Sequence, residues 1–439
     1  MVLRRSGQTL VVQVLQLAAM AGIAILLTRA AGAAGLGRYT LLSLLAQLAT
    51  LASGLGISWA AIHHVGAGKH ELSDIVSTVL GTALASGVVA VALVGASYLV
   101  ASHTYFREVT QVQIGLALVA IPLLQLNTAA ASVLLGANRP VRYALLNLIQ
   151  FGVAFVLQSG LAAAGLLSAS TGLAAWVAGI LVSLTVGLAL LSTLAPLGIR
   201  VKRAVLIDLG GYGFKGYMAN VAALLNYRID SLLVNGFVGI VALGYYSVAV
   251  AMAETVWYVA NATSLVMFPL VSSLSRAEAD RITPKVCRNT LLATALAAIV
   301  LFLASRPLLR LFFTDAMAPA LQPLWLLLPG AVCLSVGKVI ASYLSGIGKP
   351  VYATWIATAN VGLTVILDVI LIPRFGIAGA AAATSIVYIV LTAASIVVFM
   401  RESGRGFFET VLPQREDPND YVRLIRSLRG NRPEGQLRL

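Results

Sequence analysis

The chain of 439 residues is 59% hydrophobic and only 10% charged, and its mean hydropathy is +0.92. Soluble globular domains carry roughly 25% charged residues, so this composition excludes a soluble domain and predicts a helical membrane protein with many spans. A net charge of +14 could suggest a nucleic-acid partner. In membrane proteins, however, basic residues collect in cytoplasmic loops, and we expect no nucleic-acid partner.

Apolar stretches long enough to cross a hydrocarbon core of about 30 Å recur along the whole chain. The first is too long for the apolar region of a signal peptide and lacks a clear cleavage site, so it is predicted to be a permanent helix. We predict twelve spans, over residues 9–28, 40–62, 75–99, 112–134, 142–164, 171–194, 215–237, 245–268, 287–304, 322–344, 351–372 and 378–400. The predicted parts are an N-terminal six-helix lobe (1–197), a cytoplasmic linker (198–214), a C-terminal six-helix lobe (215–400) and a cytoplasmic basic tail (401–439).

The distribution of basic residues predicts the orientation. If the N-terminus lies in the cytoplasm, most of the 30 Lys and Arg residues fall on inside segments, and this asymmetry requires an even number of spans. We therefore expect a multi-pass protein of the cytoplasmic membrane with both termini inside. In the tail, residues 421–428 place apolar side chains on one helical face and arginines on the other. This pattern fits an amphipathic helix on anionic lipid and, equally, a solvated tail.

The two halves of the chain resemble each other. Residues 131–150 (ASVLLGANRPVRYALLNLIQ) match residues 341–360 (ASYLSGIGKPVYATWIATAN), and a weaker similarity pairs Gly37 with Gly244. Two halves in the same orientation predict parallel repeats related by an axis along the membrane normal. Transporters use such halves to rock about a central cavity.

Several predicted spans carry polar side chains along one helical face. Two of these stripes, one with Asn147, Gln150 and Gln158 and the other with Asn360, Thr364 and Asp368, are related by the repeat. Because lipid offers no hydrogen-bonding partners, such stripes either face a hydrated cavity or bond to a neighbouring helix. Each stripe alone fits the second explanation, whereas the set favours a hydrated central cavity. The candidate cavity residues on these stripes are Gln13, Gln16, Asn147, Gln150, Glu254, Tyr258, Asn261, Asn360 and Asp368.

The seventh span carries both Arg228 and Asp230, charges that need a protein-lined or water-lined environment within a membrane. Residues two apart cannot share a helical face, and Asn226 lies on the face of Asp230. In the functional interpretation, Arg228 in the cavity meets an anionic group of the cargo and Asp230 responds to a cation. The alternative is a structural ion pair with a neighbour such as Glu254.

Three carboxyl groups, those of Asp230, Glu254 and Asp368, are candidate coupling-ion sites, because a desolvated carboxyl group can titrate when it has access to protons. A structural role fits each of them as well. Lys338, near the cytoplasmic end of the tenth span, is interpreted as a snorkelling side chain. The two cysteines suggest no metal site, the chain has no P-loop, and we expect no catalytic residue, metal or cofactor.

The segments YRIDSLL (227–233) and LGYYSVA (243–249) resemble the polysaccharide (oligosaccharide) flippase branch of the MOP superfamily, which also holds MATE antiporters and lipid II flippases. Residues 35–39 and 346–350 agree with this resemblance. The resemblance implies an all-α, V-shaped protein with twelve transmembrane helices in two six-helix lobes around a central cavity. It implies a transporter, not an enzyme, which moves a polyprenyl-diphosphate-linked oligosaccharide across the membrane by alternating access for surface or exopolysaccharide biosynthesis.

The expected partners are the lipid-linked oligosaccharide, membrane lipid and the polysaccharide polymerase or export machinery, and the expected state is a monomer. The predicted spans contain few cations, Arg228 and Lys338, which leaves room for a neutral or zwitterionic cargo. The main alternative is a MATE-like cation-coupled antiporter of small molecules or drugs, but the first six spans nearly lack the carboxylates that it would use. A membrane glycosyltransferase needs a larger outside loop, and a lipid II flippase generally has two further spans.

Overall fold

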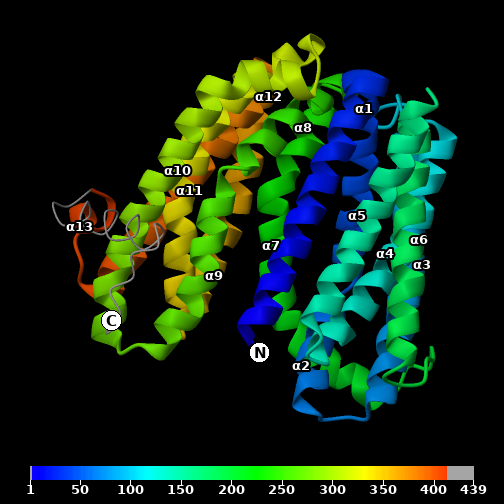
Figure 1. The fold of residues 1–439 in the computed structure, drawn as a ribbon, viewed down its shortest axis with the longest axis horizontal. Coiled ribbons are helices and arrows are strands. Elements are labelled where there is room, and N and C mark those ends of the chain that lie inside the picture. The colour runs from blue at the N-terminus through cyan, green and yellow to red at the C-terminus, as the bar shows by residue number, and fades with distance from the viewer. Residues whose placement is uncertain (1, 413–439) are drawn as a thin grey trace. The chain divides into compact units, whose positions relative to one another are not determined.

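The computed structural model describes residues 2–412, with side chains from residue 11 onward except for several between 212 and 223. The predicted amphipathic segment at 421–428 lies outside these residues. The described chain is helical almost throughout and contains no strand (Figure 1). This follows from its hydropathy, because a backbone in lipid must satisfy its own hydrogen bonds. The elements are α1 (Val2–Ser53), α2 (Ile57–Ala67), α3 (Leu72–Ala101), α4 (Gln111–Gly136), α5 (Pro140–Ala163), α6 (Ala169–Ser192), α7 (Arg203–Phe237), α8 (Ile240–Glu254), α9 (Trp257–Ser273), α10 (Arg276–Phe312), η1 (Asp315–Ala320), α11 (Leu321–Gly346), α12 (Pro350–Ser403) and α13 (Phe407–Val411).

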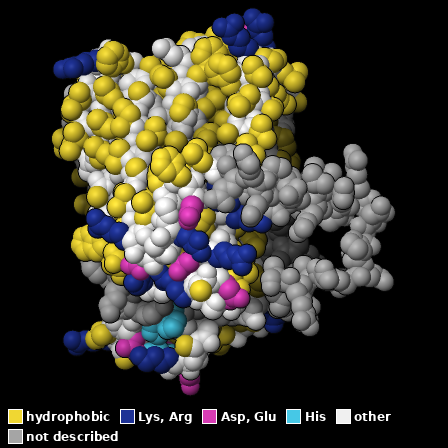
Figure 2. All heavy atoms as spheres, turned by 90° about the vertical axis from the view of Figure 1, so that its left-hand side faces the viewer, with side chains coloured by type: hydrophobic (Ala, Val, Ile, Leu, Met, Phe, Trp, Pro, Cys, Tyr) yellow, Lys and Arg dark blue, Asp and Glu magenta, His cyan; other side chains and the backbone are white. Residues whose placement is uncertain are grey.

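Among the described residues, 8 helices are long and apolar enough to cross a membrane, or up to 9 spans if the bent pair α8 and α9 forms one. One face of the molecule shows the same character, with hydrophobic side chains over its upper part and charged side chains gathered below (Figure 2). The predicted multi-pass membrane protein is therefore confirmed. Two of the long helices are broken, α1 at Gly32 and α12 at Gly376, so that each consists of two helical segments. The exact number of twelve spans stays a prediction.

The break in α12 turns the chain back on itself. Gly376 has a φ of +59°, in the left-handed region that favours glycine. In a straight helix, Leu371 and Gly379 would lie about 12 Å apart along the axis. Instead, a Cβ atom placed on Gly379 would collide with the carbonyl oxygen of Leu371. The two segments of α12 are thus connected by a reversal at a single glycine.

The helices form two compact units. In the first unit, α3, α4, α5 and α6 run side by side with α1, and α7 packs against α1, α2 and α3 (Figure 1). Its apolar core includes the buried Val79, Leu134 and Leu146. The core of the second unit includes Tyr343 and Phe399, whose rings meet edge to face at 4.9 Å. The first unit comprises Met1–Ala251, Ser305–Leu324 and Val361–Ala383, and the second comprises Met252–Ala304, Trp325–Asn360 and Thr384–Leu439. The predicted division into two six-helix lobes stays a prediction.

The sequence repeat has a counterpart in the backbone. Asn138 and Gly348 occupy the same repeat position, and both are left-handed, with φ of 57° and 79°. Two residues later, Pro140 and Pro350 each begin a helix, α5 and α12, where a proline loses no backbone hydrogen bond. The same turn followed by the same helix start therefore occurs once in each half of the sequence.

Charged residues connect the α2–α3 loop to the start of α7. The ammonium group of Lys69 donates a hydrogen bond to Asp208 at 2.7 Å, and the Nε2 atom of His70 lies 2.9 Å from the same carboxylate oxygen. Nearby, Lys202 forms an ion pair with Asp74 at 2.5 Å. These contacts lie in segments predicted to be cytoplasmic, and they hold the beginning of α7 against the beginning of α3.

The Asp208 cluster predicts a defined pH dependence of stability. Hydrogen bonds from Lys69 and His70 hold the pKa of Asp208 below its usual range. The stabilisation is therefore fully present above the pKa of an unfolded aspartate, about 3.9, and is lost as the pH falls through the lower pKa of the folded state. We expect D208N to lower the thermal midpoint of the purified protein slightly at neutral pH, with a difference that vanishes in strong acid. A difference that persists unchanged in acid would contradict this role.

Candidate functional site

A buried carboxylate lies where α7 meets α8 in the first unit. The side chain of Asp230 is only 4% exposed, although it is charged at neutral pH in its ordinary state. One of its oxygens accepts a hydrogen bond from the hydroxyl of Tyr246 at 2.6 Å, and the other accepts one from the backbone N–H of Ser231 at 2.6 Å. Tyr246 is itself fully buried. These bonds fix the orientation of the carboxylate.

A second carboxylate lies close by on the first segment of α12. The hydroxyl of Thr364 donates a hydrogen bond to the Oδ1 atom of Asn226 at 3.3 Å, which brings α12 against α7. One turn further along α12, Asp368 is 0% exposed and close enough to Asp230 for their charges to interact. Within the described part of the chain, neither carboxylate oxygen of Asp368 has a hydrogen-bond partner. A buried carboxylate without such partners is costly, so Asp368 is a candidate for protonation or for binding a cation.

These four side chains offer two carboxylates, an amide oxygen and a hydroxyl, and such oxygens suit hard cations. The sequence predicted that Asn226 shares a face with Asp230 and that Thr364 shares one with Asp368, because each pair is one helical turn apart. It did not predict that the two faces meet. The described residues include no group of three or more His, Cys, Asp or Glu side chains arranged to hold a metal.

The other candidates in the first unit lie in different surroundings. Arg228 is half-buried in α7, whereas Gln13 and Gln16 are exposed and half-buried, respectively, in the first segment of α1. Asn147 is half-buried in α5. Their roles in a cavity stay predictions.

Gln150 belongs to a hydrogen-bond network inside the first unit. Its Oε1 atom accepts from the side chain of Asn127 in α4 at 3.2 Å, and Asn127 accepts from the hydroxyl of Ser183 in α6 at 3.0 Å. Both Gln150 and Asn127 are buried. In this structure, Gln150 therefore takes part in hydrogen bonds that connect α4, α5 and α6. Bonding to neighbouring helices is the explanation that the sequence left open as the alternative to a hydrated cavity.

The second unit contains a separate polar cluster at the break between α8 and α9. The ammonium group of Lys338 in α11 donates to the Oδ1 atom of Asn261 at 2.7 Å and lies 4.4 Å from the centre of the Trp257 ring. The carboxyl group of Glu254 is close enough to interact electrostatically with Lys338 and Tyr258. Two residues of the predicted stripe, Asn261 and Glu254, thus interact with a lysine that the sequence suggested only as a snorkelling side chain. Asn360, also in this unit, is buried.

A cavity of about 270 Å³ opens between α1, α2, α4 and α7 in the first unit. Most of its wall is apolar, but the wall also carries the polar side chains of Gln47, Thr50, Ser58, Gln125 and Tyr217, for which we name it the polar cavity. The Tyr217 hydroxyl donates to the carbonyl of Ala52 at 2.7 Å, which anchors α7 to α1. This cavity was not predicted from the sequence. Gln47, Thr50 and Ser58 are spaced approximately as one helical face that continues across the glycines between α1 and α2, and this spacing could have indicated a polar wall.

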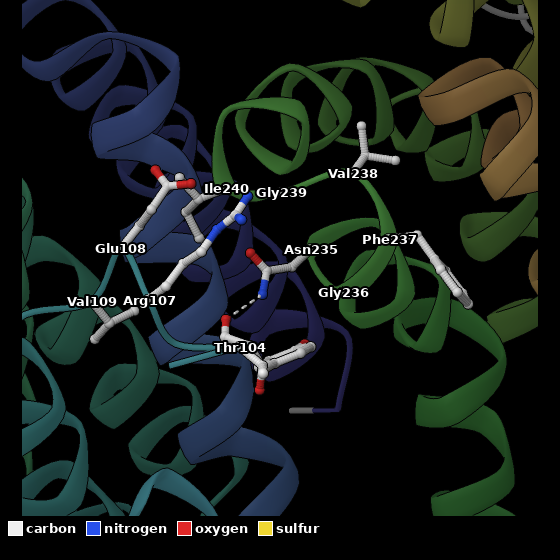
Figure 3. A pocket seen from close by; sticks show the side chains of 11 residues that line it. Thr104, Arg107, Glu108, Val109, Asn235, Gly236, Phe237, Val238, Gly239 and Ile240 are labelled. Carbon is white, nitrogen blue, oxygen red and sulfur yellow. Dashed lines mark hydrogen bonds between the residues drawn. The ribbon is translucent and has the colours of Figure 1, made fainter. Parts of the chain in front are cut away.

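A smaller polar cavity of about 170 Å³ lies where the loop before α4 meets the end of α7 (Figure 3). Arg107, Glu108 and Asn235 line it. The Asn235 side chain donates to the carbonyl of Tyr105 at 3.2 Å, and the Tyr105 hydroxyl donates to the carbonyl of Leu232 at 2.9 Å. Two reciprocal bonds therefore fasten the end of α7 to the loop after α3.

Comparison with known proteins relates the sequence to one family and to several membrane proteins. A family model described as "Polysaccharide biosynthesis protein" matches residues 26–322. An uncharacterized membrane protein of Methanocaldococcus jannaschii, MJ1068, is 25% identical over 195 residues, which cover 43% of this chain and 38% of that protein. A second one from the same organism, MJ1375, is 25% identical over 158 residues, or 36% of this chain and 37% of that protein. The chain thus matches less than two-fifths of the length of these relatives.

Solved structures show the fold. A structure of the lipid II flippase MurJ in an inward closed conformation has a TM-score of 0.75 at 16% identity, covering 99% of this chain and 94% of that one. An inward-facing MATE multidrug-resistance transporter of the MOP superfamily has a TM-score of 0.61 at 15% identity, covering 89% and 95%. At these identities the similarity concerns the fold, and it confirms the predicted MOP-like architecture. The family match shows that the chain belongs to the polysaccharide biosynthesis protein family.

Proposed function

We propose that this protein is a flippase that moves a polyprenyl-diphosphate-linked oligosaccharide across the cytoplasmic membrane by alternating access, without catalysing a chemical reaction. The observation that carries the proposal is the group of amide and hydroxyl side chains in the wall of the cavity of about 270 Å³, among apolar helices of a polysaccharide biosynthesis protein. Such side chains can bond to a hydrophilic group that must leave water to cross the bilayer.

The chemistry of the lining fits a sugar attached to a phosphate. Gln47, Gln125 and Tyr217 offer amide and hydroxyl groups, which can bond to sugar hydroxyls. Arg228, the cationic side chain within the predicted spans of the first unit, is the candidate to bind a diphosphate, because charge-assisted hydrogen bonds are the stronger ones. The MurJ structure, which has the same fold, is named a lipid II flippase.

The buried carboxylates supply a means of coupling. Asp230 and Asp368, with the oxygens of Asn226 and Thr364 beside them, bind the coupling cation, either a proton or a sodium ion. Occupation of this site neutralises charge at the contact between α7 and α12 and thereby favours one conformation over another. Glu254, beside Lys338, is the third coupling candidate.

A second candidate function is cation-coupled antiport of a small molecule. The carboxylate pair by itself favours it, since a cation site serves an antiporter as well as a flippase, and MATE transporters share the fold. The family match favours the flippase.

The flippase proposal is tested by measuring which leaflet holds the lipid-linked oligosaccharide in cells that lack this protein. An outer-facing glycan-binding probe reports exposure, and total lipid-linked product is quantified alongside. Without a redundant flippase, we expect accumulation on the cytoplasmic side and restoration by the intact chain. Normal exposure in the deletion strain would overturn the proposal and favour small-molecule export.

The same cells test the cation in α7. We expect R228A to reach the membrane in normal amounts but to restore exposure at least about tenfold less well, a loss that corresponds to one charge-assisted hydrogen bond. R281A, which removes an exposed arginine near the start of α10, is the matched control and should transport normally. Equal transport by both variants would remove Arg228 from the site.

A further inference from the structure

A large apolar cavity lies next to the polar one. It has a volume of about 670 Å³ and is bounded by α1, α3, the α1–α2 break and the start of α7. Along α3 its wall extends from Thr82 to Ser97, a distance of about 22 Å at 1.5 Å per residue. Such a length covers most of a hydrocarbon core of about 30 Å. The cavity is therefore elongated along the direction in which lipid chains lie.

The hydroxyl groups in this wall offer little to a polar ligand. Thr82 donates to the carbonyl of Thr78 at 2.7 Å, and Ser97 donates to the carbonyl of Leu93 at 2.8 Å, both within α3. The rest of the wall is mostly Ala, Val and Leu. Because its hydroxyls are satisfied by their own helix, the cavity suits a hydrocarbon chain better than a sugar or a phosphate.

The backbone between α1 and α2 and the side chain of Gln125 lie between the apolar cavity and the polar one. Gln125 lines the polar cavity, and its amide hydrogen-bonds with the hydroxyls of Ser53 at 3.0 Å and Ser86 at 2.9 Å. Both serines line the apolar cavity. The Gln125 side chain is 4% exposed, so the partition is buried.

The backbone is irregular at the same place. α1 ends at Ser53 and α2 begins at Ile57, and between them Leu55 has a φ of 46°. A left-handed conformation is unfavourable for a non-glycine residue, because its Cβ atom comes too close to a backbone carbonyl oxygen. Leu55 lines the apolar cavity, whereas its neighbours Gly54 and Gly56 line the polar one. Strain of this kind concentrates at sites where a ligand is held or a segment moves.

We propose that the apolar cavity binds the isoprenoid chain of the lipid-linked cargo while the phosphate and sugar occupy the polar cavity. The cargo then passes the partition formed by Gln125, Ser53 and Ser86. The assignment of this occupant rests on the proposed function, and the adjacency of the two cavities supports it. An amphipathic ligand needs a wall that carries polar side chains beside an apolar one, and here the two lie next to each other along the α1–α2 break.

The proposal is tested by photo-crosslinking of the full-length protein in phospholipid nanodiscs with a polyprenyl diphosphate that carries a diazirine near the end of its chain. We expect crosslinks in the segment 82–97, competed by unlabelled polyprenyl diphosphate against the constant phospholipid background. A85W places an indole in the cavity wall and should reduce this competable labelling about tenfold or more. V88W, on the same helix at a position that is 60% exposed and does not line the cavity, should leave it unchanged.

The possible outcomes separate this inference from the proposed function. If competable labelling occurs at other segments and A85W does not affect it, the apolar cavity is not the site of the isoprenoid chain (the tail site), although a polyprenyl cargo remains supported. If residues 82–97 are labelled but polyprenyl diphosphate does not compete, this segment is an ordinary lipid-facing surface and the tail site is overturned as well. Absence of competable labelling anywhere in the chain would count against both the tail site and a polyprenyl cargo. A photoreactive phosphatidylcholine used in parallel should give no competable labelling.

Discussion

Substitution of Gly244 by valine is expected to separate α8 from α1 and to destabilise the first unit strongly. A Cβ atom at Gly244 would collide with the backbone carbonyl of Ala33 and lie 3.0 Å from the Cα atom of that residue. At the partner position of the repeat, a Cβ atom at Gly37 would collide with the carbonyl of Ile240. Because backbone atoms cannot move aside as a flexible side chain does, we expect a loss of about 3 kcal/mol or more.

The matched control for this glycine contact is Gly95 in α3, where an added Cβ atom would meet nothing within 4 Å. Thermal midpoints of G244V, G37V and G95V, measured on detergent-solubilised protein, should fall clearly for the first two and stay near the parent value for the third. If G244V were as stable as G95V, the close contact of α1 and α8 would not be part of the stable fold. If G244V were stable but did not transport, the contact of α1 and α8 would be needed for transport and not for stability.

Replacement of Asp368 by asparagine is expected to abolish the response of the protein to its coupling cation. The amide keeps the shape of the side chain and removes its charge, and the parent residue is fully buried without a hydrogen-bond partner among the described residues. In cation-free buffer, D368N should be at least as stable as the parent, since a buried unpaired charge is unfavourable. A ligand at one hundred times its dissociation constant stabilises by about 2.7 kcal/mol. The parent should gain stability of this order from its cation, and D368N should gain none.

Thermal midpoints over a sodium titration at fixed pH, repeated over a pH series without sodium, distinguish a sodium site from a proton site. D315N is a suitable control, because Asp315 is an exposed carboxylate that pairs with Arg310 at 2.8 Å. If D368N and the parent respond alike to both cations, the coupling role of Asp368 is wrong. D230N should behave like D368N but start from lower stability, since it also weakens the bond to Tyr246.

The sequence predicted the local parts of the site better than their assembly. One-turn spacings correctly placed Asn226 with Asp230 and Thr364 with Asp368, because helical geometry alone determines which residues share a face. The contact between these pairs depends on how α7 packs against α12, across more than 130 residues, and no spacing encodes it. Likewise, the repeat singled out Gly37 and Gly244, but only the structure shows that they lie close to each other.

A polar residue in an apolar span did not by itself indicate whether its side chain lines a cavity or bonds to a neighbouring helix. Gln150 and Asn127 hydrogen-bond between helices, whereas Gln125 both hydrogen-bonds to other helices and lines a cavity. Composition cannot separate these outcomes, because either environment satisfies an amide. The contacts of Lys338 were not predicted for a related reason. Its partners Asn261 and Trp257 belong to another helix, which comes close only in the folded chain.

The beginning of α7 also differs from the expected pattern. The segment 198–214 was predicted to be a linker, but the helix already starts at Arg203 and continues to Phe237. Polar residues such as Lys202 and Asp208 gave this segment the composition of a loop. The helix is instead stabilised by tertiary ion pairs with Asp74, Lys69 and His70, which a local reading of the chain does not reveal.

The most direct test of the flippase proposal is reconstitution of the full-length protein into liposomes that carry a fluorescent polyprenyl-diphosphate-linked oligosaccharide. A membrane-impermeant quencher reports the fraction of labelled sugar in the outer leaflet over time. We expect protein-dependent movement of the sugar between leaflets, reduced in R228A and D368N and normal in R281A. Failure to move the lipid-linked sugar, combined with accumulation of small organic cations in the same liposomes, would contradict the proposal and identify an antiporter.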